Sequence, residues 1–118
     1  MTTARTPLKI VACKKDRAGT AQHVTIETTL SEPPTSDLKA SVERHSGEEP
    51  ASWSMEEGAG PQFSGSSVSV FVGSPNRKHL SDSVVALDRK LREVGVIVEP
   101  SIDIKTEVES LEAELAAW

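Results

Sequence analysis

Residues 67–95, SVSVFVGSPNRKHLSDSVVALDRKLREVG, change their hydrophobic period partway along. From residue 67 to residue 73 valine alternates with other residues, which predicts a strand with its valines on one face. From residue 77 to residue 94 apolar side chains recur at spacings of four, three, four and three, which predicts an amphipathic helix. Gly95 is expected to end this helix, because glycine readily adopts the left-handed conformation that follows a helix. The apolar positions of the two elements are Val68, Val70, Val72, Leu80, Val84, Leu87, Leu91 and Val94.

A second strand is predicted directly after this helix. Residues 96–98, VIV, are apolar, and Pro100 limits the strand because proline cannot donate to a sheet ladder. Ile102 and Ile104 are candidates to continue it as an edge strand. Two strands joined by a helix run parallel with a right-handed crossover by default. One strand-helix-strand unit is therefore expected over residues 67–98.

The start of this unit resembles parts of known families. The strand and turn VFVGS at residues 70–74, the helix after it and residues 96–98 are locally similar to the opening unit of TIR-like and nucleoside deoxyribosyltransferase-like domains. The resemblance implies further parallel strands, but only one apolar triplet and one helical stretch follow here. No residue matches the catalytic glutamate of those families, so the resemblance assigns neither a family nor an activity.

The N-terminal third predicts a β-hairpin. Residues 7–14 and 23–30 both alternate in the manner of strands. The loop between them, residues 16–22, contains Gly19 and is too short for a helical crossover, so the two strands should pair antiparallel. Pro33 and Pro34 follow and should end the pairing.

Two later segments are harder to interpret. Residues 37–45 fit a helix with Ser36 or Asp37 as its N-cap, slightly better than a third strand with a return strand at residues 51–56. Residues 46–66 are rich in glycine, proline and serine and predict a long, polar, flexible loop. Its aromatic residues, Trp53 and Phe63, either anchor the loop on the core or contact a partner.

The C-terminus predicts an amphipathic helix. Thr106 and Glu109 have the spacing of a capping box, and an apolar stripe follows at Val108, Leu111, Leu115 and Trp118. A helix of about a dozen residues is marginal alone in water. Its stripe must therefore dock, either on the sheet of the same chain or on another subunit or partner. Together these elements predict a small single α+β domain over residues 1–118, made of an antiparallel hairpin, one strand-helix-strand unit and this helix.

Composition excludes several classes of protein. The chain has 118 residues and a net charge of -5, distributed as +3 over residues 1–30, -5 over 31–76, +2 over 77–94 and -5 over 95–118. Mild acidity argues against nucleic-acid binding, which depends on clustered lysine and arginine. No apolar run approaches the ~20 residues that span a bilayer, and the first residues lack the apolar segment of a signal peptide. With Cys13 as its single cysteine, the chain is expected to be soluble and cytoplasmic.

One turn is a candidate anion-binding site. Gly73, Ser74, Asn76 and Arg77 stand between a strand and a helix N-terminus, where backbone N–H groups and the helix dipole attract anions. However, neither glycine-rich phosphate-binding motif is present, and Pro75 removes one donor. Nucleotide or phosphate binding at this turn is therefore the alternative hypothesis.

No motif specifies an enzyme. His23, His45 and His79 lack the spacing of a metal site, the paired glutamates lie in the polar loop, and Cys13 fits a buried small hydrophobe. Neither a cofactor nor a metal is predicted. The leading hypothesis is a non-enzymatic protein–protein interaction or assembly module, an accessory subunit that binds a protein partner or its own copies. Its candidate partner-binding residues are Trp53, Phe63, Leu111, Leu115 and Trp118.

Overall fold

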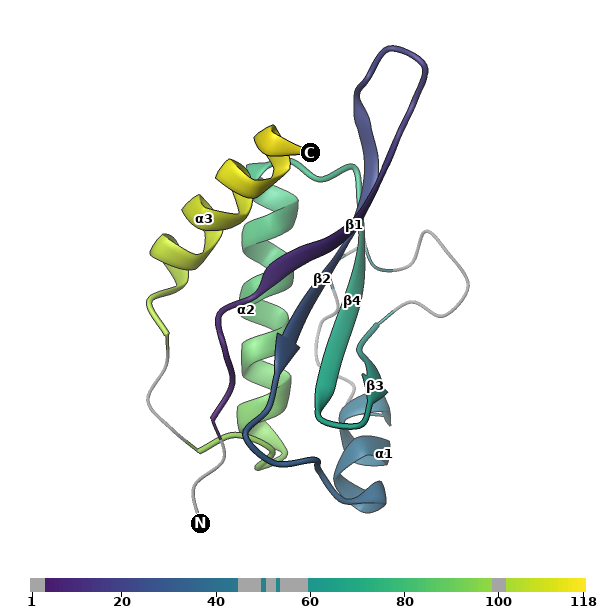
Figure 1. Cartoon of the computed structure of the whole chain (residues 1–118). Helices are drawn as coiled ribbons and strands as arrows, with labels where there is room; N and C mark the ends of the chain where they lie inside the picture. Colours follow the sequence, from purple (N-terminus) through teal and green to yellow (C-terminus); the bar gives the residue numbers. More distant parts are fainter. Residues whose placement is uncertain (1–3, 45–49, 51–52, 54–59, 99–101) are drawn as a thin grey trace.

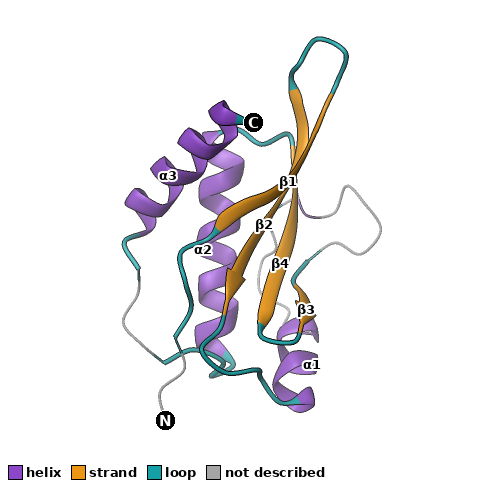
Figure 2. Ribbon diagram, in the orientation of Figure 1, coloured by secondary structure: helices purple, strands orange, loops and turns teal. Residues whose placement is uncertain are grey.

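An antiparallel sheet backed by helices organises the computed structural model, which describes residues 4–44, 50, 53, 60–98 and 102–118 (Figures 1 and 2). Within these residues the sheet has four strands in the order β1-β2-β4-β3. The α+β class is thus confirmed. In chain order the elements are β1 (Lys9–Lys15), β2 (Ala21–Thr29), α1 (Ser36–Arg44), β3 (Gln62–Ser64), β4 (Ser67–Gly73), α2 (Arg77–Glu93) and α3 (Ile104–Ala117).

The predicted hairpin is confirmed. β1 and β2 pair antiparallel, with Ile10 opposite Ile26 and Lys14 opposite His23. The register shifts between Ile10 and Ala12, so one extra residue bulges from β1. At the tip, the Asp16 carboxylate accepts from the N–H groups of Ala18 and Thr20, and Gly19 supplies a positive φ of 84°.

The predicted second parallel strand at residues 96–98 is wrong. The N–H of Val96 donates to the carbonyl of Leu91 at 2.8 Å, so this backbone closes the end of α2 instead of joining a ladder. Gly95, with a φ of 81°, makes the turn back. Val96 and Ile97 are buried as apolar anchors of the helix end, which explains why an apolar triplet here resembles a strand. The described sheet is therefore wholly antiparallel.

The helix predicted over residues 37–45 is confirmed as far as residue 44, and residue 45 lies outside the described residues. α1 begins at Ser36, and the cap is Thr35, whose hydroxyl accepts from the N–H of Leu38 at 3.2 Å. The side chain of Val42 is fully buried and packs this helix against the core. The alternative return strand at residues 51–56 lies outside the described residues except for Trp53.

Most of the predicted loop at residues 46–66 also lies outside the described residues. Its last part contains a strand that was not predicted, β3, which pairs with the start of β4 through Phe63 and Val68. Gly65, with a φ of 61°, turns the chain between these two strands. Only three residues form β3, too few for alternation to reveal it.

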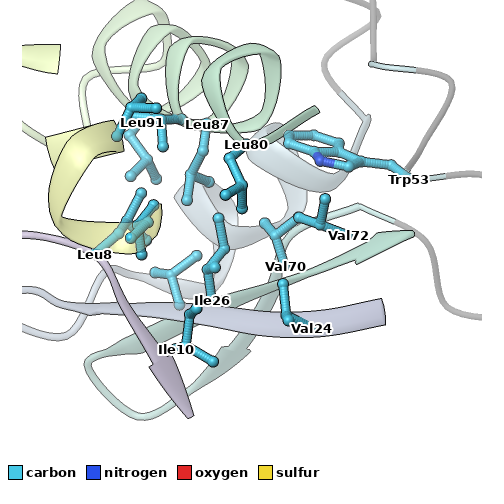
Figure 3. Close-up of a cluster of buried hydrophobic side chains, with 14 of the residues drawn as sticks. Leu8, Ile10, Val24, Ile26, Trp53, Val70, Val72, Leu80, Leu87 and Leu91 are labelled. Atoms are coloured by element: carbon cyan, nitrogen blue, oxygen red, sulfur yellow. The ribbon is translucent and has the colours of Figure 1, made fainter. Parts of the chain in front are cut away.

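The core lies between the sheet and the helices (Figure 3). The buried alternate residues of β2 and β4 pack in one cluster with the apolar stripe of α2. Figures 1 and 3 show α2 and α3 on one side of the sheet. Central members of this cluster are Val24, Ile26, Val68, Val70, Val72, Leu80, Val84, Leu87 and Leu91.

The C-terminal helix starts earlier than predicted and docks on its own domain. Asp103 is the N-cap of α3, so Thr106 is not; the Thr106 hydroxyl instead donates to the Asp103 carboxylate at 2.8 Å. Ile104, expected in an edge strand, is the first residue of this helix. α3 packs against α2 and β1. Of its stripe, Val108 and Leu111 are buried.

A buried ionic cluster joins three distant parts of the chain. Arg5 donates from Nε to Asp88 of α2 at 3.0 Å, and from its two terminal nitrogens to Glu107 of α3 at 2.6 and 2.9 Å. The side chains of Arg5 and Glu107 are 2 % and 0 % exposed. Burial would lower the pKa of Arg5, but the hydrogen bonds and charges of Glu107 and then Asp88 outweigh it and raise that pKa. Arg5 therefore stays charged, and its two carboxylates compensate it.

Glutamates of α3 also cover the edge of β1. The N–H of Leu8 donates to Glu107 at 2.6 Å, and the N–H of Ile10 donates to Glu114 at 3.1 Å. The Lys15 ammonium donates to the carbonyl of Trp118 near the other end of the strand. An open strand edge invites pairing with another chain, so these contacts protect β1.

Removing the shared cation should destabilise the fold strongly. Arg5→Ala leaves the buried Glu107 without its cation and Asp88 with Arg92 alone, and should lower the free energy of unfolding by about 3–5 kcal/mol. Arg77→Ala removes the exposed pair with Glu112 and should cost about 0–1 kcal/mol. Urea denaturation at pH 7 measures both values. Equal losses of unfolding free energy in the two variants would contradict the claim that the buried ion pairs of Arg5 stabilise the fold more than an exposed pair does.

The cap of α3 should make stability depend on acid pH. The Thr106 hydroxyl, together with backbone N–H groups, holds the pKa of Asp103 below its usual value. A carboxyl with a lowered folded-state pKa stabilises the fold above its unfolded pKa of about 3.9, and this contribution is lost as pH falls through the lower folded value. Asp103→Asn still caps the helix but does not titrate. Between pH 6 and pH 2.5 the variant should therefore lose less stability than the wild type in urea titrations, and identical losses would refute this.

Candidate functional site

The face of the sheet that points away from α2 and α3 holds the candidate site (Figure 1). Strand alternation sends the valines of β4 into the core and Phe71 to the opposite face. On β2 the same alternation places His23, Thr25 and Glu27 on that face, where each is half-buried. We call this surface, from Lys14 of β1 to Phe71 of β4, the outer face.

His23 and Phe71 form an aromatic pair on the outer face. Their ring centroids lie 4.2 Å apart at an interplanar angle of 39°. The register explains the contact, because His23 pairs with Gly73 and Thr25 pairs with Phe71, which makes the two rings diagonal neighbours. The pair forms a rigid aromatic wall at the end of the sheet near the hairpin.

A pocket of about 450 Å³ adjoins this wall. Gly73 stands directly opposite His23 and has no side chain to fill the space. Its φ is not positive, so the backbone there does not require glycine. The lining residues are Thr20, Ala21, Gln22, His23, Phe71, Gly73 and Ser74.

Positive charge gathers at this end of the molecule. The hairpin tip and the N-terminus of α2 lie at the same end (Figure 1). Lys14, Arg17 and Lys78 are exposed there, and their side chains form no hydrogen bond or ion pair in the part of the chain that the structure describes. The Asp16 carboxylate accepts a hydrogen bond from the backbone of the hairpin turn. These cations are thus available to an acidic ligand.

The four residues of the predicted anion site are not brought to one point. Gly73 and Ser74 line the pocket, and the N–H of Ser74 donates to the carbonyl of Gln22 at 2.8 Å. Asn76 caps α2 by accepting from the N–H of His79 at 2.9 Å. Arg77 lies 3.5 Å from Glu112 in an exposed ion pair. The side chains of Asn76 and Arg77, and the backbone N–H of Ser74, are therefore occupied by structural contacts.

The turn holds no activated nucleophile. Ser74 has a positive φ of 46°, but its hydroxyl makes no hydrogen bond with either histidine in the described structure. Nδ1 of His79 lies 2.7 Å from the carbonyl of Ser74, and it must carry the proton because a carbonyl only accepts. Serine catalysis needs a base within hydrogen-bond reach of the hydroxyl. Neither histidine supplies one to Ser74.

The predicted partner-binding residues are dispersed. Trp53 is 1 % exposed, and its indole N–H donates to the Ser83 hydroxyl at 2.9 Å, so it anchors its segment on the core (Figure 3). Leu111 is fully buried as well, while Phe63 and Leu115 are half-buried against the core. Trp118 is 47 % exposed at the end of α3. Among these five, Trp118 offers the largest exposed fraction to a partner.

Sequence reasoning did not select His23 and Phe71. The alternation in residues 67–73 does place Phe71 opposite the valines, which was the available signal. Its neighbour could not be named, because the register between β2 and β4 cannot be deduced from either strand alone. Within the described residues, no group of three histidine, cysteine or acidic side chains could hold a metal ion, and no helix is long and apolar enough to cross a membrane.

Comparisons with protein-family models, with curated proteins and with solved structures found no match.

Phe71 should contribute much less to stability than a core residue. Phe71→Ala removes a half-exposed ring and should cost under about 2 kcal/mol, below the roughly 3–5 kcal/mol of a buried phenylalanine. Ile26→Ala, on the inner side of β2, should cost about 2–5 kcal/mol. Thermal and urea unfolding compare the two variants. If Phe71→Ala proved the more damaging, the outer face would belong to the core.

Proposed function

We propose that this protein is a non-enzymatic interaction module that binds a protein partner through its outer face. The observation that carries the proposal is the aromatic pair of His23 and Phe71, half-exposed beside a pocket and away from α2 and α3. Aromatic side chains supply much of the binding energy at protein interfaces. A rigid aromatic wall also loses little conformational entropy on binding.

The chemistry of the pocket favours binding over catalysis. Among the described residues that line it, His23 is the only titratable side chain, and none of the others carries a carboxylate, thiol or amine. General acid–base catalysis needs a proton-transfer group placed against the reacting atom, usually with a second group that tunes or orients it. The described structure provides His23 with an aromatic neighbour instead. A cytoplasmic accessory role fits a chain with one cysteine.

Nucleotide or phosphate binding is the second candidate. It is favoured by the position of the pocket, which touches the turn before α2 at Gly73 and Ser74. It is weakened by the use of Asn76 as a helix cap and of Arg77 in an ion pair. A protein partner needs neither residue, so it agrees better with these contacts.

Differential capture tests the proposal. The immobilised full chain, its Phe71→Ser variant and a Val85→Ser control are exposed to the same cell extract, and a retained protein is then purified for calorimetry. Val85 is an exposed apolar residue of α2, on the helix side of the sheet. The partner should bind wild type and Val85→Ser alike, and Phe71→Ser about tenfold or more weakly.

Two outcomes would contradict the proposal. Retention of the same proteins by all three baits would show that Phe71 makes no specific contact. Self-association that depends on Trp118 and not on Phe71, measured by light scattering, would move the interface to the end of α3.

A further inference from the structure

We infer that the partner contributes an acidic segment, with one apolar side chain in the pocket beside His23 and Phe71 and its carboxylates facing Lys14, Arg17 and Lys78. The inference rests on the proposed function and adds the chemistry of the partner. It depends on the shape of the pocket, the pairing of charges across the outer face and the overall charge of the chain.

The pocket is large enough to admit one large side chain. Its volume of about 450 Å³ lies toward the lower end of the roughly 300–1,000 Å³ typical of ligand sites. The wall is aromatic, while Thr20, Gln22 and Ser74 place polar groups around it. An apolar or aromatic side chain can therefore pack on the rings while the backbone of its segment meets polar groups at the rim.

Cross-strand pairing leaves the pocket end of the outer face positive. Lys9 stands directly opposite Glu27, so their opposite charges compensate each other at the far end of β1 and β2. Lys14 stands directly opposite His23, so no carboxylate faces it across the strand pair. Arg17 at the hairpin tip and Lys78 in the first turn of α2, whose side chains are unpaired among the described residues, extend this positive end beyond the sheet. A carboxylate that approaches His23 from solvent therefore meets Lys14 beside it.

The overall charge favours a short acidic segment over a polyanion. The chain carries -5, and residues 95–118 alone carry -5. A long phosphate backbone would be attracted at the hairpin end and repelled by the rest of the molecule. A peptide segment with a few carboxylates is small enough to feel only the local positive field. Electrostatic complementarity thus selects a protein segment.

Backbone amide NMR of the full chain tests the inference directly. The probes are a blocked peptide of sequence Asp-Phe-Asp-Glu and its counterpart Lys-Phe-Lys-Lys, with inorganic phosphate and AMP as separate arms. The acidic peptide should shift the amides of His23, Phe71, Gly73 and Ser74, and the basic peptide should not. Lys14→Glu should weaken the acidic peptide about threefold or more. The control Arg89→Glu makes the same charge change at an exposed position of α2 and should leave binding unchanged.

Each other outcome overturns the inference. Equal binding of both peptides, or no effect of Lys14→Glu, would refute the acidic partner. Neither result would contradict the proposal that the protein is an interaction module. Shifts at Ser74 with phosphate or AMP, without shifts from the acidic peptide, would assign the pocket to a small anion. If no probe binds, the acidic segment is refuted, and the capture experiment with Phe71→Ser decides the proposed function separately.

Discussion

The contact between Arg5 and Glu107 holds the structure together. It joins the first described residues to the last helix, and Asp88 brings α2 into the same cluster. A buried cation is tolerated only when nearby anions compensate the loss of water, and Arg5 has two carboxylates within hydrogen-bond distance. Glu107 also accepts the N–H of Leu8, so one carboxylate fixes both the docking of α3 and the edge of the sheet.

The asymmetry of the domain follows from this arrangement. α2 and α3 are fixed on one side of the sheet, and α3 lies along β1, where a partner strand would otherwise add. The outer face is left to side chains that no described helix covers, with the aromatic pair of His23 and Phe71 at its hairpin end (Figure 1). The surface proposed to bind a partner therefore lies on the face of the sheet, while the β1 edge of the sheet is protected.

Local pattern predicted the elements whose signal is local. Alternation in β1, β2 and β4 and the stripe of α2 required only neighbouring residues, and all four elements are present as expected. Residues 96–98 misled because Val96 and Ile97 are apolar through burial at the end of α2 and not through strand pairing, while Val98 is exposed. The start of α3 was misplaced because Asp103 takes the cap that Thr106 was predicted to provide. One error concerns the existence of an element and the other the start of one, and neither changes the α+β class.

Long-range partners could not be predicted in the same way. Arg5 and Glu107 are 102 residues apart, and nothing near either residue indicates the other. The candidate site could not be predicted for the same reason, because the contact between Phe71 and His23 depends on the register of β2 and β4. Trp53 shows a different case: the sequence left open whether it anchors its segment on the core or contacts a partner, and its burial and its hydrogen bond to Ser83 place it in the core.

Hydrogen exchange at the amide of Leu8 tests the central claim most directly. This amide faces away from β2, and its bond to Glu107 forms only while the ionic cluster holds α3 in place. If the fold depends on the ionic cluster, the amide of Leu8 should exchange only through global unfolding, as slowly as the amide of Ile26 in the middle of the sheet. Exchange of Leu8 orders of magnitude faster than that of Ile26 would show that α3 leaves β1 freely, and the account would be contradicted.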